Sequence, residues 1–116
     1  MQPSRLFKCL SDETRLRCVT LLQKEGRLCV CELTVALDLS QPKISRHLAS
    51  LRQCNVVVDI REGQWVIYQI NPELPRWAHL ILDDVLAAVE KNEQLDIDLQ
   101  RLHQMPGRPG MTAECC

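Results

Sequence analysis

The segment CELTVALDLSQPKISRHLASLRQ, residues 31–53, decides the predicted fold. Apolar residues recur at helical spacing in its first part, residues 31–37, and again in its second part, residues 41–53. A three-residue connection separates the two parts, and Pro42 fits the first turn of the second helix because its missing N–H is not needed there. Two short helices joined in this way predict a helix-turn-helix unit, whose second helix reads the major groove of DNA.

The segments on either side extend this unit into a larger fold. Residues 56–60 and 65–70 are rich in β-branched and aromatic side chains, and Gly63 lies in the connection between them, so we expect a two-stranded hairpin. A helix is expected upstream, between a capping residue at Ser11 or Asp12 and a stop at Gly26.

One long helical region is expected downstream, from Pro75 to Leu102. Its apolar stripe is wider than one small domain needs for its own core, which favours a dimer. The fold class predicted is therefore mainly α (α+β): a dimeric winged helix-turn-helix with a two-stranded β-hairpin wing.

Length and composition limit the class of protein. A chain of 116 residues is one domain, which we place at residues 1–104, followed by a flexible tail at 105–116 that ends in Cys115 and Cys116. No apolar run is long enough to span a membrane, and the first residues do not read as a signal peptide. We therefore expect a cytoplasmic protein whose seven cysteines stay reduced.

The net charge of −1 conceals an uneven distribution. Residues 1–64 carry ten Lys or Arg against seven Asp or Glu, whereas residues 65–116 carry four against eight. A basic front and an acidic back are typical of a chain that meets a polyanion with one face, although ordinary scatter of charge gives the same numbers.

The polar side chains of the second helix suit contact with DNA. Gln pairs with adenine, Arg and Lys pair with guanine, and Ser and the helix N-terminus hold phosphates. The candidate DNA-binding residues are Gln41, Lys43, Ser45, Arg46 and His47 on the helix, Arg52 at its end, and Arg61 and Gln64 at the hairpin. The alternative is a small domain whose exposed polar face has no such role.

Four blocks of the sequence resemble the ArsR/SmtB family of metal-responsive repressors, in particular its arsenical-resistance operon repressors. The blocks occur in family order, as LSDETRLRCVTLL (10–22), LCVCEL (28–33), SQPKISRHLASLR (40–52) and GQWVIYQI (63–70). The resemblance implies a winged-helix homodimer that represses an operon from double-stranded operator DNA. It also implies that the repressor leaves the DNA when a metalloid binds, and that no cofactor is required for DNA binding.

Cys29 and Cys31 are the candidate metal ligands. Thiolates select soft ions, by extension As(III) and Sb(III), although a pair of small cysteines also packs well in a core. On a regular helix, residues two apart point about 200° from each other, so one ion cannot be held by both without unwinding the first turn. Binding there should strain the element that supports the recognition helix.

The third ligand is less clear than the pair. Related arsenic repressors carry a third cysteine three residues after it, where this chain has Thr34. Solvent or a small thiol could complete the site, as could Cys115 or Cys116 of the tail. The remaining three cysteines lie on or near apolar helical faces and are expected in the core: Cys9, Cys18 and Cys54.

Other functions remain open to the sequence alone. A repressor of the same fold could respond to Cd, Zn or Pb, or to thiol oxidation, or could bind DNA without any inducer. A small thiol enzyme is a weaker alternative, because the LCVCEL block contains no His and the chain lacks the βαβ context of small oxidoreductases. We therefore expect a regulator and not an enzyme.

Overall fold

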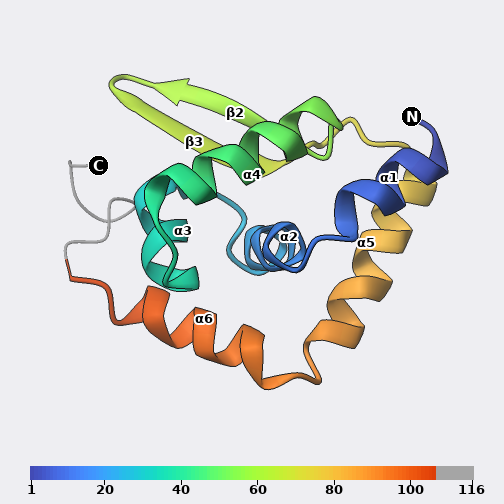
Figure 1. The fold of residues 1–116 in the computed structure, drawn as a ribbon. Helices are drawn as coiled ribbons and strands as arrows, with labels where there is room; N and C mark the ends of the chain where they lie inside the picture. The colour runs from blue at the N-terminus through green and yellow to red at the C-terminus, as the bar shows by residue number, and fades with distance from the viewer. Residues whose placement is uncertain (107–116) are drawn as a thin grey trace.

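A computed structural model describes residues 1–106, which form six helices and one three-stranded sheet (Figure 1). The elements are, in chain order, α1 (Pro3–Leu10), α2 (Glu13–Glu25), β1 (Leu28–Cys29), α3 (Val30–Leu37), α4 (Gln41–Gln53), β2 (Val57–Glu62), β3 (Trp65–Ile70), α5 (Arg76–Val89) and α6 (Glu93–His103). Within the described residues, none of these helices has the length and apolar character needed to cross a membrane.

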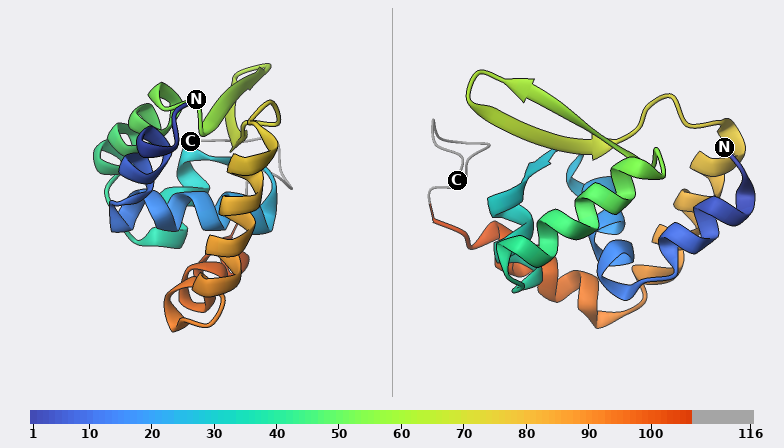
Figure 2. Two further views of the ribbon diagram at one scale, coloured as in Figure 1. Left: turned by 90° about the vertical axis from the view of Figure 1, so that its right-hand side faces the viewer. Right: turned by 45° about the horizontal axis from the view of Figure 1, so that its top comes forward.

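Helix α2 lies at the centre of the molecule, with the other helices around it (Figures 1 and 2). Asp12 caps its start, as expected, because the Asp12 carboxylate accepts a hydrogen bond of 3.0 Å from the Arg15 N–H. Gly26 ends it at a φ of 88°, a conformation that a residue with a side chain rarely adopts. Val19 and Leu21 have no exposed surface, so α2 forms the middle of the hydrophobic core.

The sheet has the order β1-β3-β2, and both pairings are antiparallel. The expected two-stranded hairpin is confirmed as β2 and β3, and the sheet has a third strand that the sequence analysis did not include. The short strand β1 pairs with β3 through Leu28 opposite Tyr68 and Cys29 opposite Ile67. Two residues are too few to show an alternating pattern, so the sequence carries no signal for this strand.

The helix-turn-helix pair is confirmed. Helix α4 has the predicted bounds, and α3 begins one residue earlier than predicted, at Val30. The three residues between them include Asp38, whose φ of 56° turns the chain from one helix to the next.

The prediction of a single long helical region after Pro75 is wrong. The chain leaves the helical path after Val89, and α6 begins beyond Asn92, which takes an extended backbone. This break lets α6 fold back against α2 and α3, where Leu95 and Leu102 are buried (Figure 2).

Candidate nucleic-acid interface and thiol pair

The buried face of α4 fixes which of its side chains point outward. Ile44, Leu48 and Leu51 have no exposed surface, so the helix is held to the core along this stripe. Ser40 caps the helix, since its hydroxyl accepts a hydrogen bond of 3.4 Å from the Lys43 N–H. The recognition helix is thus anchored along its length and at its start.

Most of the predicted DNA-binding residues of α4 lie on its outer face. Gln41, Ser45 and Arg46 are exposed, and Lys43 is half-buried. These side chains offer amide, hydroxyl and cationic groups, which are the groups that contact base edges and phosphates.

His47 lies differently from its neighbours on α4. It is half-buried, and its Nδ1 is 3.8 Å from the Asp12 carboxylate at the start of α2. Burial lowers the pKa of His47, and the opposing attraction of Asp12 is weaker. His47 therefore sits at the junction of α2 and α4, and a role in contacting DNA stays a prediction.

The wing and the recognition helix share a hollow. A cavity of about 250 Å³ lies between them, and four predicted DNA-binding residues line it: Gln41, Arg52, Arg61 and Gln64. Arg52 also forms an ion pair of 3.3 Å with Asp59 of β2, which ties the end of α4 to the wing. Arg61 and Gln64 are exposed, so the wing presents polar groups beside the helix.

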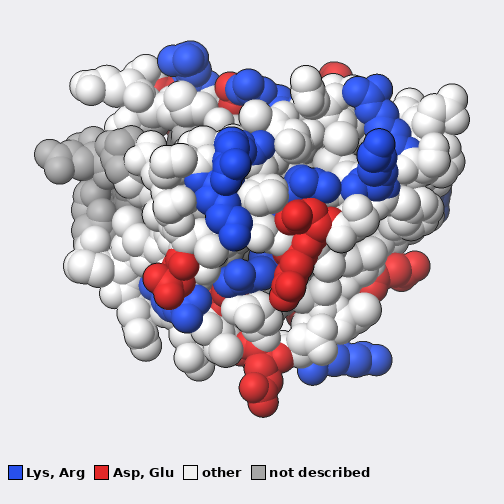
Figure 3. All heavy atoms as spheres, viewed as in Figure 1, with Lys and Arg blue, Asp and Glu red and all other residues white. Residues whose placement is uncertain are grey.

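Basic side chains are prominent on the face that carries α4. Figure 3 shows Lys and Arg side chains over α4, the wing and α1, with acidic side chains among and below them. The described structure thus agrees with the basic front expected from the sequence, and a duplex would meet positive charge along this face.

Cys29 occupies a joint between the sheet and α3. It is the last residue of β1 and the residue that precedes the first turn of α3, and only 2% of it is exposed. Its N–H donates a hydrogen bond of 3.0 Å to the buried carboxylate of Glu32. The directions expected for residues two apart on a regular helix therefore do not apply to this pair, because the backbone of Cys29 is extended.

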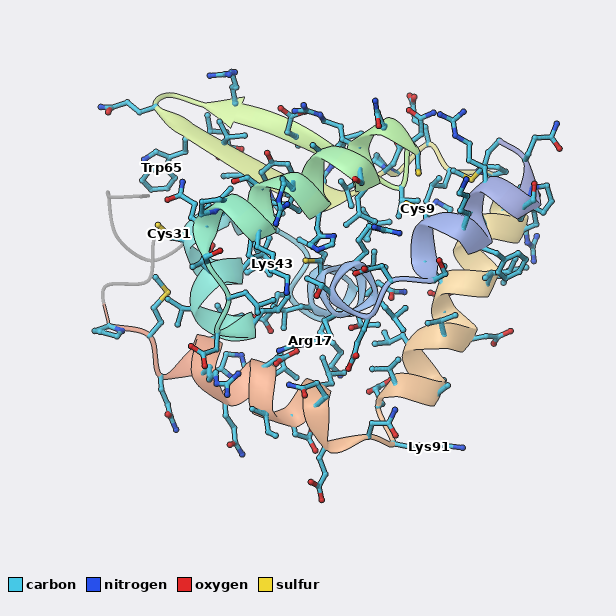
Figure 4. The ribbon with its side chains drawn as sticks, in the orientation of Figure 1. Cys9, Arg17, Cys31, Lys43, Trp65 and Lys91 are labelled. Atoms are coloured by element: carbon cyan, nitrogen blue, oxygen red, sulfur yellow. The ribbon has the colours of Figure 1, made fainter. Side chains whose placement is uncertain are left out.

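Cys31 lies in the first turn of α3 and is half-buried. Figure 4 shows it at the start of that helix, on the side of the molecule that carries Trp65. One turn further on, the Thr34 hydroxyl donates a hydrogen bond of 2.8 Å to the Val30 carbonyl, so this hydroxyl is already engaged. Residues 1–106 contain no cluster of three or more His, Cys, Asp or Glu arranged to hold a metal.

The other cysteines divide as follows. Cys9 and Cys18 are buried as expected, whereas Cys54 is half-buried at the end of α4. Cys115 and Cys116, the suggested additional ligands, lie outside the described residues.

Two residues that position α4 were not identified from the sequence. Arg5 of α1 donates a hydrogen bond of 3.0 Å to the carbonyl of Gln53, the last residue of α4, and Asp12 faces His47. Both contacts join residues far apart in the chain, so no local sequence pattern points to them.

A helix-turn-helix with a wing beside its second helix and a basic outer face defines a winged-helix DNA-binding regulator. Comparison with known proteins places the chain more narrowly. The model of the bacterial regulatory protein, arsR family, matches residues 12–58. The chain belongs to this family and is a transcriptional regulator, not an enzyme.

Individual relatives cover most of the chain. It is 50% identical to the arsenic resistance transcriptional regulator ArsR1 of Pseudomonas putida over 115 residues, which is 99% of this chain and 88% of the relative. It is also 50% identical to the arsenical resistance operon repressor of Escherichia coli K12, covering 79% of each chain. The crystal structure of the antimony-specific transcriptional repressor AntR matches with a TM-score of 0.61 and 30% identity, covering 77% of this chain and 78% of that one.

Proposed function

We propose that this chain is a cytoplasmic, metalloid-responsive repressor. A homodimer binds operator DNA through α4 and the wing, and it is released when Cys29 and Cys31 bind As(III) or Sb(III). The names of the relatives support this proposal, since two are arsenic regulators and a third is specific for antimony. DNA binding itself requires no cofactor.

The observation that carries the proposal is the position of Cys29. Its backbone is shared by two elements, since it pairs with Ile67 in the sheet and its N–H binds Glu32 of α3. A change at this residue therefore reaches the wing through β3 and the recognition helix through α3.

The chemistry of the thiol pair fits a soft ion. Two thiolates separated by one residue at a helix start are soft donors. As(III) would supply bonds to both sulfurs when bound. Cys29 would have to leave its buried position in the described structure to share a ligand with Cys31, because only 2% of it is exposed.

Dimer formation would supply the second recognition helix. Phe7 of α1 and Leu80 of α5 are exposed apolar residues. Their two helices lie on the side of the molecule that faces the viewer in the left panel of Figure 2. Burying this surface against a second copy would place two copies of α4 along one duplex, as paired half-sites require.

The test is DNA binding by the reduced protein, measured by fluorescence anisotropy on a duplex selected by this protein from a random-sequence library. As(III) and Sb(III) should each lower the affinity, by about 5–150-fold, the usual range of coupling between two sites. Parallel titrations with Cd(II), Zn(II) and Pb(II) examine the divalent alternative.

The variants Cys29→Ser and Cys31→Ser should each bind DNA normally and lose the response to As(III). Thr34→Ser is the matched control, since it changes a neighbouring polar residue and should respond as the parent does. Unchanged DNA affinity of the parent protein with As(III) and Sb(III) would refute the proposal, as would a full response in both cysteine variants.

A further inference from the structure

A second pair of thiols lies away from Cys29 and Cys31, where α1 meets the end of α4. Cys9 of α1 and Cys54 at the end of α4 are both free thiols. They line the same cavity, which measures about 310 Å³. The Cys54 side chain also contributes to the raised pKa of Cys9, so the two thiols interact although 44 residues lie between them in the sequence.

Several contacts hold the two cysteines in this arrangement. The Arg5 guanidinium donates to the carbonyl of Gln53, next to Cys54, at 3.0 Å. The Arg15 Nε donates to the carbonyl of Cys9 at 2.7 Å, and the Cys9 thiol lies 3.9 Å from the Ser50 carbonyl. These contacts hold α1 against the end of α4, so that both cysteines line one cavity in the folded state.

The environment of the two thiols is unequal. Cys9 is 3% exposed, and burial raises its pKa to about 12, with a further contribution from Cys54. Cys54 is half-buried and shares the cavity with the cationic side chains of Arg5, Lys8 and Arg15. Cys54 is therefore the sulfur of the pair that a dissolved oxidant reaches more easily.

We propose that Cys9 and Cys54 form a redox-active pair that a hydroperoxide oxidises to an intramolecular disulfide between α1 and α4. This goes beyond metalloid sensing, because it uses different residues and a different chemical input. Its location matters because one of the two helices joined is the recognition helix.

The reaction takes two steps. In the first, the Cys54 thiol loses its proton, its sulfur attacks one oxygen of hydrogen peroxide and the O–O bond breaks. Cys54 becomes a sulfenic acid, and the departing hydroxide takes up the proton lost by the thiol and leaves as water. In the second, the Cys9 sulfur loses its proton and attacks the Cys54 sulfur, forming the S–S bond and releasing a second water. Two thiols are oxidised by two electrons, and one peroxide is reduced to two waters.

Peptide mapping after peroxide treatment tests the proposal. The double variant Cys29→Ser/Cys31→Ser is the starting protein, so that the metalloid pair takes no part. After oxidation, blocking of remaining thiols and trypsin digestion without reductant, we expect residues 9–15 and 53–61 as one cross-linked peptide. Addition of a reductant should separate it into the two expected peptides.

Adding one further substitution to this double variant then separates the roles of Cys9 and Cys54. With Cys9→Ala added, Cys54 should stop at the sulfenic acid and react with dimedone, a reagent specific for that group. With Cys54→Ser added, neither the cross-link nor the dimedone adduct should form at this joint. Circular dichroism of each variant confirms that it is folded before oxidation.

The proposal is overturned if the folded starting protein shows no 9–15/53–61 cross-link while other cysteines are oxidised, or if Cys9 and Cys54 both remain as thiols. Because Cys29 and Cys31 are absent from this protein, either result leaves the metalloid proposal standing. Conversely, if As(III) does not release the parent protein from DNA, the proposal of a disulfide between Cys9 and Cys54 is unaffected.

Discussion

At the scale of single residues, the contact between Asp12 and His47 joins the start of α2 to the recognition helix. The Asp12 carboxylate caps α2 and faces the His47 ring at 3.8 Å. Burial is the largest influence on His47 and lowers its pKa below the ordinary value of 6.5. The folded protein therefore holds the neutral ring more strongly than the unfolded chain does.

This difference predicts how stability changes with pH. Well above pH 6.5 the ring is neutral in both states. As the pH falls toward 6.5, the unfolded chain binds a proton before the folded protein does, so the free energy of unfolding decreases. We expect the parent to lose stability between pH 7 and pH 5.5, and His47→Gln to lose less. Urea titrations across this range measure both slopes. Equal slopes would show that His47 does not contribute.

Thr34 lies three residues after Cys31 on α3, at the position that could supply a further ligand. Residues three apart on a helix share a face, so Thr34→Cys should place a third thiolate beside Cys31. The As(III) concentration that releases half of the DNA should fall by about tenfold, equal to ~1.4 kcal/mol of added binding. Anisotropy titrations of this variant, with Thr34→Ser beside it, give the comparison. An unchanged midpoint would mean that the first turn of α3 does not hold the ion.

At the scale of elements, one buried ion pair ties three helices together. The Arg17 guanidinium of α2 binds the Asp98 carboxylate of α6 at 2.8 and 3.1 Å and also donates to the carbonyl of Leu37, at the end of α3. Asp98 is 1% exposed, and Gln94 donates to it as well (Figure 4 labels Arg17). The ion pair thus holds α6 against the base of the helix-turn-helix.

Removing one partner of this ion pair should destabilise the fold. Asp98→Ala leaves the Arg17 charge partly buried without its carboxylate, and we expect the free energy of unfolding to fall by about 3–5 kcal/mol. Arg101→Ala is the matched control on the same helix, since its contact with Asp38 is exposed and 4.0 Å long, and it should change little. Chemical denaturation measures both. If Asp98→Ala lowers the free energy of unfolding as little as Arg101→Ala does, the role given to Asp98 is contradicted.

The same elements show how far sequence reasoning reaches. Helix α4 was predicted at its observed bounds because a proline, a capping serine and a regular apolar stripe all act locally. The strand β1 and the break after Val89 were missed, because each depends on partners distant in the chain. Strand β1 exists only where β3 pairs with it, and α6 turns back because α2 and α3 offer it a surface.

The candidate site shows the same difference between features set by local sequence and features set by distant contacts. The sequence identified Cys29, Cys31 and the outer residues of α4 from residue type and spacing. It did not indicate that Cys29 is in a strand or that His47 packs against Asp12. Nor did it indicate that Cys9 and Cys54 lie together, because their pairing arises only when α1 packs against the end of α4.

At the scale of the whole molecule, the exposed side chains of α1 and α5 predict the dimer. Phe7 is 55% exposed and Leu80 is 51% exposed, the two highest values among the large apolar side chains of residues 1–106. Leu80→Glu should raise the dimer dissociation constant by roughly tenfold or more, since an unpaired carboxylate is costly to bury. Sedimentation equilibrium measures this change.

Ile97→Glu provides the control for that measurement. Ile97 is 39% exposed on α6, and the same change of chemistry there should leave the dimer intact. If both variants weaken the dimer equally, or neither does, the surface formed by α1 and α5 is not the interface.

The central claim is that the thiol pair and the DNA-binding surface are coupled, and such coupling must act in both directions. The most direct measurement is the As(III) affinity of the reduced protein, determined by near-ultraviolet thiolate absorption with and without saturating selected duplex. We expect As(III) to bind about 5–150-fold more weakly when DNA is bound. Equal As(III) affinities in the two states would contradict the account.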